Sequence, residues 1–549
     1  MAKKTKTSRM LSPIMPSEWD ENSARHLLNR AGFGIPHERV AHLARVGPTI
    51  AVDEMVDYEG FPAPDEVPTF LPAPEEYYEL RRRLRELDPE ERRKARQEFN
   101  NRERALVQGL QGWWYERMTT TARPLEEKMA LFWHGHFATS AQKVQSARFN
   151  FNLNQVFREN AVGNFKALTI AVGQSPAMLR YLDNQQNVKG RPNENWAREL
   201  MELFTLGVGN YTEDDIKASA RAFTGWRVDE SGFAFHEWVH DFGTKTFMGR
   251  TGGFDGWDIL DIIFEQPAAA EFICRKLFEF FVYRDPEPEI VEALASTLRR
   301  HDYEIKPLLN QLFRSKVFYS SKAVGTQIKS PVQFVVQLSH DLNLADPPYQ
   351  AMARAAAGLG QNLFYPPNVA GWEGGRMWIN ANTLLTRYNM PKTLVVADLV
   401  EPDETPMMMD RRDMERATRE AYRKELDSIL SQESPERRRA FQQKMRNAST
   451  QEERRDMIEE ALFESSASGH WDLRGIYAEL EFSTALECAD ALSRRYLSRS
   501  LSNRQRRHLA GALGGDGRPD APLSAEDLTR GQMSDTLHLL FSLAEYQLC

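Results

Sequence analysis

The sequence has 549 residues, of which 27% are charged and 41% hydrophobic, the composition of an ordinary globular protein. Its formal net charge of −8 argues against broad nucleic-acid binding, which usually needs a basic balance, so no nucleic-acid partner is expected. No segment reaches the roughly 18 apolar residues of a membrane span, and none is expected.

The N-terminus and the cysteines bear on the cellular compartment. The basic start of the chain is not followed by the apolar stretch of a signal peptide, so we expect a cytoplasmic protein, with export left open for a chain whose leader has been removed. Cys274, Cys488 and Cys549 lie far apart and form no CxxC pair. They fit a reducing compartment or simple use in the core.

In chain order, the sequence predicts a polar N-terminal tail at 1–20 and then a main helical domain at 21–400. Within that domain, prolines between 59 and 74 favour an extended connector, because proline restricts its own backbone and that of the residue before it. Dense alternating charges then predict a solvated helical hairpin inserted at 75–108 and broken near Pro89.

The later segments supply the remaining elements. Aromatic and β-branched residues separated by glycines predict a small β-hairpin or ribbon near 226–250. A glycine- and proline-rich loop is expected at 359–380, a charged helical insert at 401–465, and a C-terminal helical region at 466–549 that packs on the main domain. The predicted fold class is mainly α, a large multi-helix globular protein with one small β element.

Four groups of polar residues are candidates for a functional site, and the first is the pair His134 and His136. Residues two apart point to the same side of an extended segment but about 200° apart on a helix. Gly135 disfavours a helix interior, so an extended ending here would let the two imidazoles bind a transition metal together. The alternative is that both histidines hydrogen-bond the backbone at a helix end.

The second group lies on one predicted helix. There Glu199 and Glu202 share a stripe, while Glu194, Arg198 and Glu202 are spaced as an i, i+4 ion chain. Two carboxylates one turn apart can bind a metal or divide the roles of acid and base. The alternative is a salt-bridge network that orients Arg198.

The third group, His240, Asp241 and Lys245, places an imidazole, a carboxylate and an amine within six residues. Such groups can supply a metal ligand and a general acid or base. Asp241 is also well suited to stabilise a turn by bonding to nearby backbone, which is the alternative.

The fourth group lies in the loop at 366–380. Its glycines allow the backbone to approach a ligand closely, Asn368 adds a polar side chain, and Trp372 and Trp378 can offer stacking faces to a sugar ring. The alternative is that the two tryptophans fill corners of a helical core.

Taken together, these motifs are similar to the bacterial domain-of-unknown-function family 1800. The resemblance runs from about residue 20 to the C-terminus, apart from the charged inserts. The matching stretches are 26–34, 132–137, 195–207, 211–216, 224–226, 240–246, 366–372 and 545–548.

The resemblance implies no established activity. Proteins similar to this family are often encoded beside sulfatase-like proteins, so the resemblance implies such a protein as a partner, and many relatives carry export signals. This chain has Phe204 where many relatives place a histidine, so a ligand role of that histidine would be lost here.

Two main hypotheses of function follow. The first is a metal-assisted hydrolase acting on a glycan or its ester, with zinc, iron or manganese held by His134, His136, Glu202 and His240. Its catalytic residues would be Glu199, Asp241, Lys245 and Arg198, and its substrate-binding residues Trp372, Trp378 and Asn368. The alternative is a non-catalytic binding or assembly subunit that works with the sulfatase-like partner. A redox or oxygen-using metal protein ranks behind both, and the sequence predicts no oligomeric state.

Overall fold

The structure is a computed structural model that describes residues 7, 9–34, 37–63, 67–230, 232–344, 346–399, 473–514, 518–520 and 522–549, with a few positions between 438 and 445. The predicted insert at 401–465 lies outside the described residues apart from those positions. Two compact units make up the chain: unit 1 comprises 1–32, 42–323 and 362–373, and unit 2 comprises 33–41, 324–361 and 374–549.

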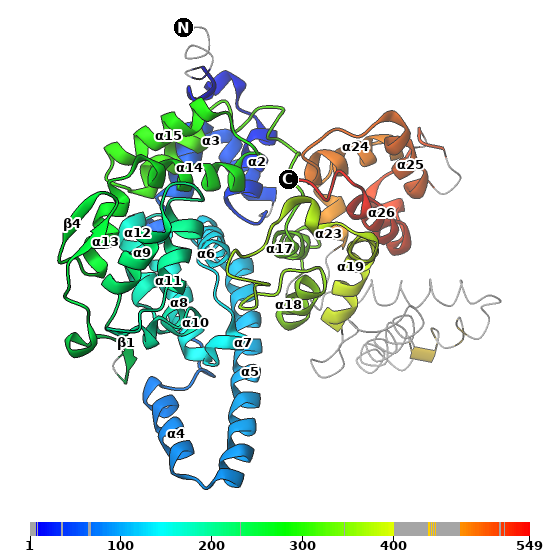
Figure 1. The fold of residues 1–549 in the computed structure, drawn as a ribbon. Coiled ribbons are helices and arrows are strands. Elements are labelled where there is room, and N and C mark those ends of the chain that lie inside the picture. Colours follow the sequence, from blue (N-terminus) through cyan, green and yellow to red (C-terminus); the bar gives the residue numbers. More distant parts are fainter. Residues whose placement is uncertain are drawn as a thin grey trace. The chain divides into compact units, whose positions relative to one another are not determined.

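Helices dominate the described chain (Figure 1), which confirms the mainly α fold class. From the N-terminus to residue 205 they are η1 (Pro16–Glu18), α2 (Glu21–Ala31), α3 (His37–Val56), η2 (Tyr58–Gly60), α4 (Pro74–Glu86), α5 (Pro89–Thr120), α6 (Pro124–His136), α7 (Ala141–Val144), α8 (Ala147–Glu159), α9 (Phe165–Gln174), α10 (Pro176–Tyr181), η3 (Asn184–Gln186), α11 (Asn195–Glu199) and the π-helix η4 (Leu200–Thr205). The next are α12 (Glu213–Ala222), η5 (Glu237–Val239), α13 (Gly256–Phe264), α14 (Pro267–Phe281), α15 (Pro288–Arg300) and α16 (Ile305–Arg314).

The predicted β element consists of two antiparallel hairpins. Strand β1 (Trp226–Asp229) pairs with β2 (Gly232–Phe235), and β3 (Lys245–Phe247) pairs with β4 (Arg250–Gly252). In the first hairpin Trp226 lies opposite Phe235 and Asp229 opposite Gly232. Alternating aromatic residues between glycines therefore formed strands where the sequence predicted them.

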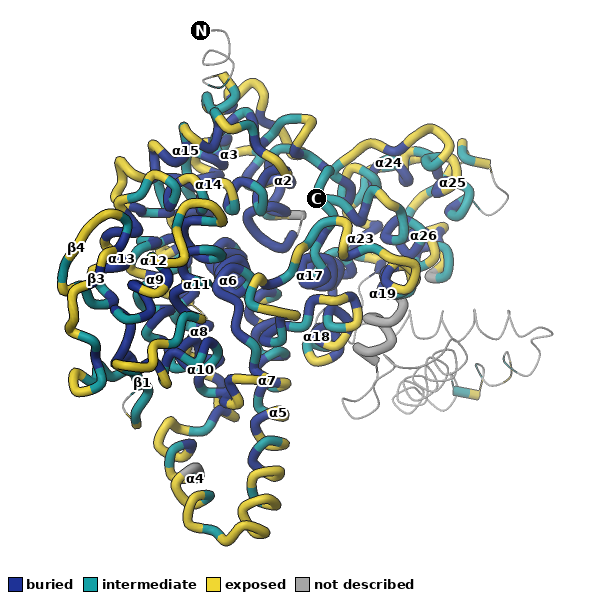
Figure 2. The backbone as a smooth tube through the Cα atoms, in the orientation of Figure 1, coloured by how far each residue is buried: buried dark blue, intermediate teal, exposed yellow. Residues whose placement is uncertain are grey.

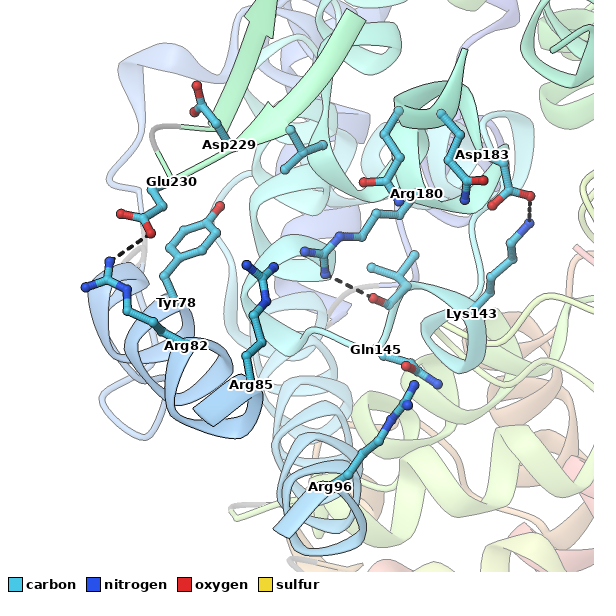
Figure 3. Close-up of a pocket in the computed structure, with 14 residues that line it drawn as sticks. Tyr78, Arg82, Arg85, Arg96, Lys143, Gln145, Arg180, Asp183, Asp229 and Glu230 are labelled. Atoms are coloured by element: carbon cyan, nitrogen blue, oxygen red, sulfur yellow. Dashed lines mark hydrogen bonds and ion pairs between the residues drawn. The ribbon is translucent and has the colours of Figure 1, made fainter. Parts of the chain in front are cut away.

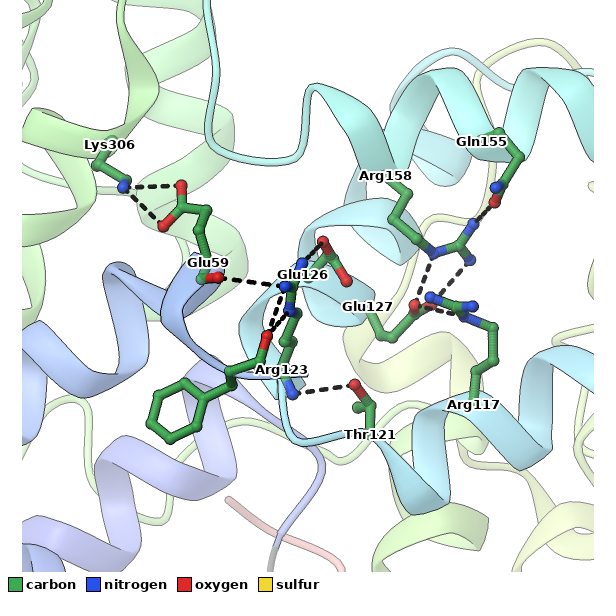
Figure 4. A network of polar contacts seen from close by, with 10 residues as sticks. Glu59, Arg117, Thr121, Arg123, Glu126, Glu127, Gln155, Arg158 and Lys306 are labelled. Atoms are coloured by element: carbon green, nitrogen blue, oxygen red, sulfur yellow. Dashed lines mark hydrogen bonds and ion pairs between the residues drawn. The ribbon is translucent and has the colours of Figure 1, made fainter. Parts of the chain in front are cut away.

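The core of unit 1 is built around α6, which is drawn as buried along its length in Figure 2. Every residue from 125 to 134 of this helix is buried, including charged side chains that need partners there. Glu127 accepts hydrogen bonds from Arg117 on α5 (3.0 Å), from Arg158 on α8 (2.6 and 2.9 Å) and from the Trp114 indole (2.8 Å). This ion triad, shown in Figure 4, ties three core helices together.

Helix α4 and the first half of α5 form the charged hairpin that the sequence predicted, here called the arm (Figure 1). Its two helices are joined by an ion pair between Arg102 and Glu76 (2.5 Å), and Asp88 caps the first turn of α5 after the break. The second helix runs on to Thr120, beyond the predicted end at 108, because its later turns enter the core with Val107, Leu110 and Trp114 buried.

The predicted polar tail at 1–20 is only partly a tail. Ile14 and Trp19 are buried, and the Ile14 amide donates to the carbonyl of Arg314 (2.8 Å) while the Lys316 amide donates to that of Ser12 (2.9 Å). Apolar residues spaced within a polar stretch pack this segment against the rest of unit 1.

Unit 2 contains residues that the sequence assigned to the main domain. Its helices are α17 (Pro331–Asp341), α18 (Tyr349–Gly358), η6 (Gly375–Trp378), α19 (Ala381–Leu399), α23 (Leu473–Ala478), α24 (Ala485–Tyr496), α25 (Asn503–Leu513), η9 (Ala525–Asp527) and α26 (Arg530–Ser542). The C-terminus explains this grouping, because the Cys549 amide donates to Gln327 (2.9 Å) and the Lys329 amide donates to Gln547 (2.8 Å). Distant segments thus share one unit.

None of the described helices is both long and apolar enough to cross a membrane. The three cysteines are free and buried, as expected for simple use in the core.

Candidate anion-binding site

The predicted metal ligands His134 and His136 lie on a helix, because α6 continues through His136 and does not end in extended backbone at Gly135. A loop of unit 1 covers Gly135: the backbone of Gly371 approaches its carbonyl oxygen, and the indole of Trp372 lies beside it. Being helical, the two histidines project in different directions.

His134 is a buried hydrogen-bond acceptor. Its Nε2 accepts from the Phe364 amide (3.0 Å), and its ring contacts those of Trp114, Phe364 and Trp372. Burial lowers the pKa of His134 to about 3, so the imidazole is neutral at physiological pH. The side chain satisfies a backbone N–H inside the core.

His136 uses both ring nitrogens. Its Nε2 donates to the carbonyl of Phe204 (3.0 Å), and the Nζ of Lys276 lies 3.4 Å from its Nδ1 while also donating to the carbonyl of Leu203 (3.1 Å). Burial drives the pKa of His136 well below its usual range and lowers that of Lys276 to about 8. An ammonium group therefore stands where a metal would approach His136.

The glutamate stripe is a half-exposed network. Arg198 pairs with Glu194 (3.3 Å) as predicted, but its second partner is Glu213 (2.9 Å). The expected partner Glu202 instead accepts from the Tyr211 hydroxyl (2.8 Å), because the π-helix that begins at Leu200 breaks the i, i+4 spacing. Burial and the charge of Glu202 together raise the pKa of Glu199.

The third group forms a structured turn. Asp241 accepts from Arg221 (2.7 and 3.3 Å) and from the Gly243 amide (2.8 Å), and the buried Lys245 donates to the carbonyls of Asp241 (2.5 Å) and Gly243 (3.1 Å). The hydrogen bond from Arg221 holds the pKa of Asp241 at about 2. His240 is buried and donates from Nδ1 to the carbonyl of Thr224 (2.7 Å).

Each of the predicted metal ligands His134, His136, Glu202 and His240 is therefore already engaged in a hydrogen bond within the fold. Over the ranges that the structure describes, no three histidine, cysteine, aspartate or glutamate side chains are grouped to hold a metal ion. Asn368 is exposed and accepts from the Ala370 amide (2.9 Å), while Trp372 packs on α6. Trp378 belongs to unit 2 and is only 7% exposed, so its ring is a core side chain.

A different set of side chains surrounds a cavity of about 650 Å³ in unit 1 (Figure 3). It lies between the arm and the elements α7, α10, η3 and β1. The lining residues are Tyr78, Arg82, Arg85, Arg96, Lys143, Val144, Gln145, Arg180, Asp183, Gln185, Gln186, Val228, Asp229 and Glu230, and we call this cavity the cationic pocket.

Five of these side chains are cationic and three are acidic, which leaves a formal charge of +2. Arg82 pairs with Glu230 (2.8 Å) and Lys143 with Asp183 (2.7 Å). Within the part of the chain that the structure describes, neither Arg85 nor Arg96 has an ion-pair partner, and Figure 3 shows both reaching in from the arm. Arg180 in the opposite wall also has no ion-pair partner among the described residues, so the unpaired positive charge belongs to Arg85, Arg96 and Arg180.

The opposite wall is fixed in place. Arg180 donates to the Tyr77 hydroxyl (2.5 Å), and its guanidinium lies 4.3 Å from the centre of the Phe149 ring. Gln145 and Asp183 have left-handed backbone, with φ of 51° and 58°. A left-handed backbone is uncommon in residues other than glycine, and such residues cluster at functional sites.

The sequence did not reveal this pocket, because its residues come from four separated segments. The available signal was the arginine-rich run at 81–85, which the prediction treated as a solvated surface.

The comparison with known families bears on the whole chain. The model of a family described as a protein of unknown function, DUF1800, matches residues 26–548. The chain belongs to the DUF1800 family. No curated protein and no solved structure shows a significant match to it. The DUF1800 description carries no activity, so a function for this chain has to be argued from its own residues.

Proposed function

We propose that this DUF1800 protein is a non-catalytic binding subunit that holds an anionic group of its ligand in the cationic pocket. The observation that carries the proposal is the pair Arg85 and Arg96, which face one cavity with no carboxylate paired to either among the described residues. An anion bound in this cavity would offset the positive charge of its lining and accept hydrogen bonds from the guanidinium groups. The planar guanidinium matches the oxygens of carboxylate, sulfate and phosphate groups.

The lining supports binding more than chemistry. It contains no serine, cysteine or histidine to act as a nucleophile or proton carrier. Two of its three carboxylates, Asp183 and Glu230, are already paired with cations and are poor general bases for that reason.

The test is calorimetric titration of the purified protein with inorganic pyrophosphate at low ionic strength. We expect Arg85→Ala/Arg96→Ala to weaken binding by roughly tenfold or more, since hydrogen bonds to charged groups each contribute about 1.5–3 kcal/mol. The matched control is Arg93→Ala, which removes an exposed arginine of α5 that does not line the pocket.

Two results would contradict the proposal: no binding of pyrophosphate to the wild type, or an equal loss in Arg93→Ala. Circular dichroism of each variant shows whether the arm remains helical.

The hydrolase and the sulfatase-like partner remain predictions of the sequence. The metal reading is tested by the metal content of wild type and His134→Ala/His136→Ala. One equivalent of zinc, iron or manganese that disappears in the variant would favour the hydrolase over a binding subunit. A partner role is tested by co-purification with the sulfatase-like protein, with Arg85→Ala/Arg96→Ala showing whether the pocket takes part.

A further inference from the structure

Unit 1 exposes a group of aromatic side chains on the segment after the first hairpin. Trp238 is 77% exposed and Phe242 is 62% exposed. The imidazole of His236 stacks on the Trp238 indole, with ring centres 4.4 Å apart and planes 26° from parallel. We call His236, Trp238 and Phe242 the aromatic platform. Large aromatic side chains presented to solvent beside polar groups are typical of binding surfaces.

The platform is held rigidly although its rings are exposed. The His236 amide donates to the carbonyl of Gly225 (2.8 Å), and the carbonyl of Val239 accepts from the Lys189 amide (2.8 Å). The Asp241 amide donates to the Thr224 hydroxyl (2.8 Å), and the buried ring of His240 packs edge-on against Phe242. Because the backbone is fixed in this way, only the exposed side chains have to be ordered when a ligand binds.

The first hairpin connects the platform to the cationic pocket. Asp229 lines the pocket and pairs with Gly232 at the start of β2. Strand β2 then leads directly to His236, four residues later, which at about 3.3 Å per residue is about 13 Å of extended chain. A ligand that contacts both the pocket and the platform has to span a comparable length.

On the other side of the hairpin, η3 makes the same connection. Gln185 and Gln186 of this helix line the pocket, and Lys189, three residues further on, is bonded to the platform loop.

We infer that the ligand is an acidic oligosaccharide, whose carboxylate or sulfate groups enter the cationic pocket while a sugar ring stacks on Trp238. This inference rests on the proposed function and names its ligand class. Arginines bind the anionic groups, the amides of Gln145, Gln185 and Gln186 match hydroxyl groups, and the indole matches the flat face of a sugar ring.

A single-stranded nucleic acid also combines anions with flat rings. The pocket fits it less well, because its lining holds a single aromatic side chain, Tyr78, whereas sites for single-stranded nucleic acid stack successive bases on several aromatic rings.

The experiment compares Trp238→Ala with wild type by calorimetry. Its probes are inorganic pyrophosphate, a single uronic acid, a uronic acid hexasaccharide, a sulfated hexasaccharide, a neutral glucose hexasaccharide and a single-stranded oligonucleotide matched in charge. We expect Trp238→Ala to weaken the better acidic hexasaccharide by roughly threefold to tenfold, the range of an exposed stacking contact, and to leave pyrophosphate and the monosaccharide unchanged. Tyr388→Ala, which removes an exposed aromatic of unit 2, is the control and should change nothing.

The probes and variants distinguish the two proposals. If pyrophosphate binds through Arg85 and Arg96 but Trp238→Ala binds the acidic hexasaccharides as well as wild type does, the inference is overturned and the proposed function stands. Failure of pyrophosphate to bind removes the proposed function itself. Tighter binding of the oligonucleotide, or equal binding of the neutral hexasaccharide, would also overturn the inference. Tighter binding of the uronic acid hexasaccharide or of the sulfated hexasaccharide would show which anionic group is recognised, and either result supports the inference.

Discussion

The backbone of Gly371 lies against the carbonyl oxygen of Gly135, so closely that a β-carbon at position 371 would overlap that oxygen. Gly371 also has a φ of +77°, which residues with a side chain rarely adopt. This contact docks the 366–372 loop on the end of α6 and joins two segments that the sequence singled out as candidate functional motifs. The residues of these two segments pack on one another, and His134 takes part in that packing through its contact with the Trp372 ring.

Gly371→Ala should therefore destabilise unit 1. Adding the cost of left-handed backbone to that of overpacking, we expect a loss of about 2–5 kcal/mol in the free energy of unfolding, measured by urea denaturation. Gly249→Ala is the matched control: its φ is also +77°, but a β-carbon there would meet nothing within 4 Å. It should cost about 1–2 kcal/mol, from the backbone alone. Equal losses in the two variants would show that the close approach to Gly135 is unimportant.

Glu127→Gln should be more damaging than its small change in shape suggests. The variant leaves Arg117 and Arg158, both buried, without the carboxylate that neutralises them. Breaking a buried ion pair by removing one partner typically costs about 3–5 kcal/mol. Glu126→Gln, one residue earlier, is the control, because burial and the charge of Glu127 raise the pKa of Glu126 and its ionised form is already disfavoured. A loss of stability in Glu126→Gln as large as that in Glu127→Gln would contradict the triad's role.

The same triad predicts a dependence on pH. Burial alone would raise the pKa of Glu127, but the charges and hydrogen bonds of Arg158 and Arg117 outweigh it and hold the pKa at about 2. Since an unfolded glutamate titrates near 4.3, its contribution is fully present above about pH 5 and is lost as the pH falls toward 2. The difference in unfolding free energy between wild type and Glu127→Gln should be constant from about pH 5 to 7 and shrink below. A difference that grows on acidification would be inconsistent with this assignment.

Lys329 should make the stability of unit 2 depend on pH in the alkaline range. Its ammonium is buried 3.7 Å from the centre of the Tyr546 ring, and burial lowers its pKa to about 8 despite the nearby Asp341. Between about pH 8 and 10 the unfolded chain binds a proton that the folded chain has released, so this group makes stability rise with pH. In Lys329→Met this rise should be missing. The difference in unfolding free energy between wild type and the variant should therefore grow between about pH 8 and 10. Lys322→Met, which removes an exposed lysine, should retain it.

Local signals in the sequence predicted much of the fold. Pro89 marked the break in the arm, where Asp88 caps the first turn of α5. Trp226 begins the first hairpin, where alternating aromatic residues indicated a strand. Each of these features depends on residues only a few positions apart, which is why sequence alone reveals them.

The arrangement of the candidate site depends on contacts between residues far apart in the sequence, which local sequence patterns do not reveal. Arg158 lies 31 residues from Glu127, and Lys276 lies 140 residues from His136, so neither partner could be paired from the sequence. The π-helix at Leu200–Thr205 moved Glu202 away from Arg198 and toward Tyr211. Likewise, Arg85 and Arg96 belong to a predicted solvated hairpin, and only the folded arm brings them to one cavity.

Glu230→Gln tests whether charge in the cationic pocket governs anion affinity. The substitution releases Arg82 from its ion pair (2.8 Å) and raises the formal charge of the lining from +2 to +3. We expect pyrophosphate to bind roughly two to three times more tightly at low ionic strength, with the gain reduced at 0.15 M salt, because the pair is exposed and screened. Glu79→Gln is the matched control: it releases Arg83 from a similar pair on the same helix (2.5 Å), but neither residue lines the pocket. If both variants bind pyrophosphate equally well, the gain comes from net charge alone and the pocket is not the binding site. A gain confined to Glu230→Gln places the anion beside Arg82, between the arm and the first hairpin.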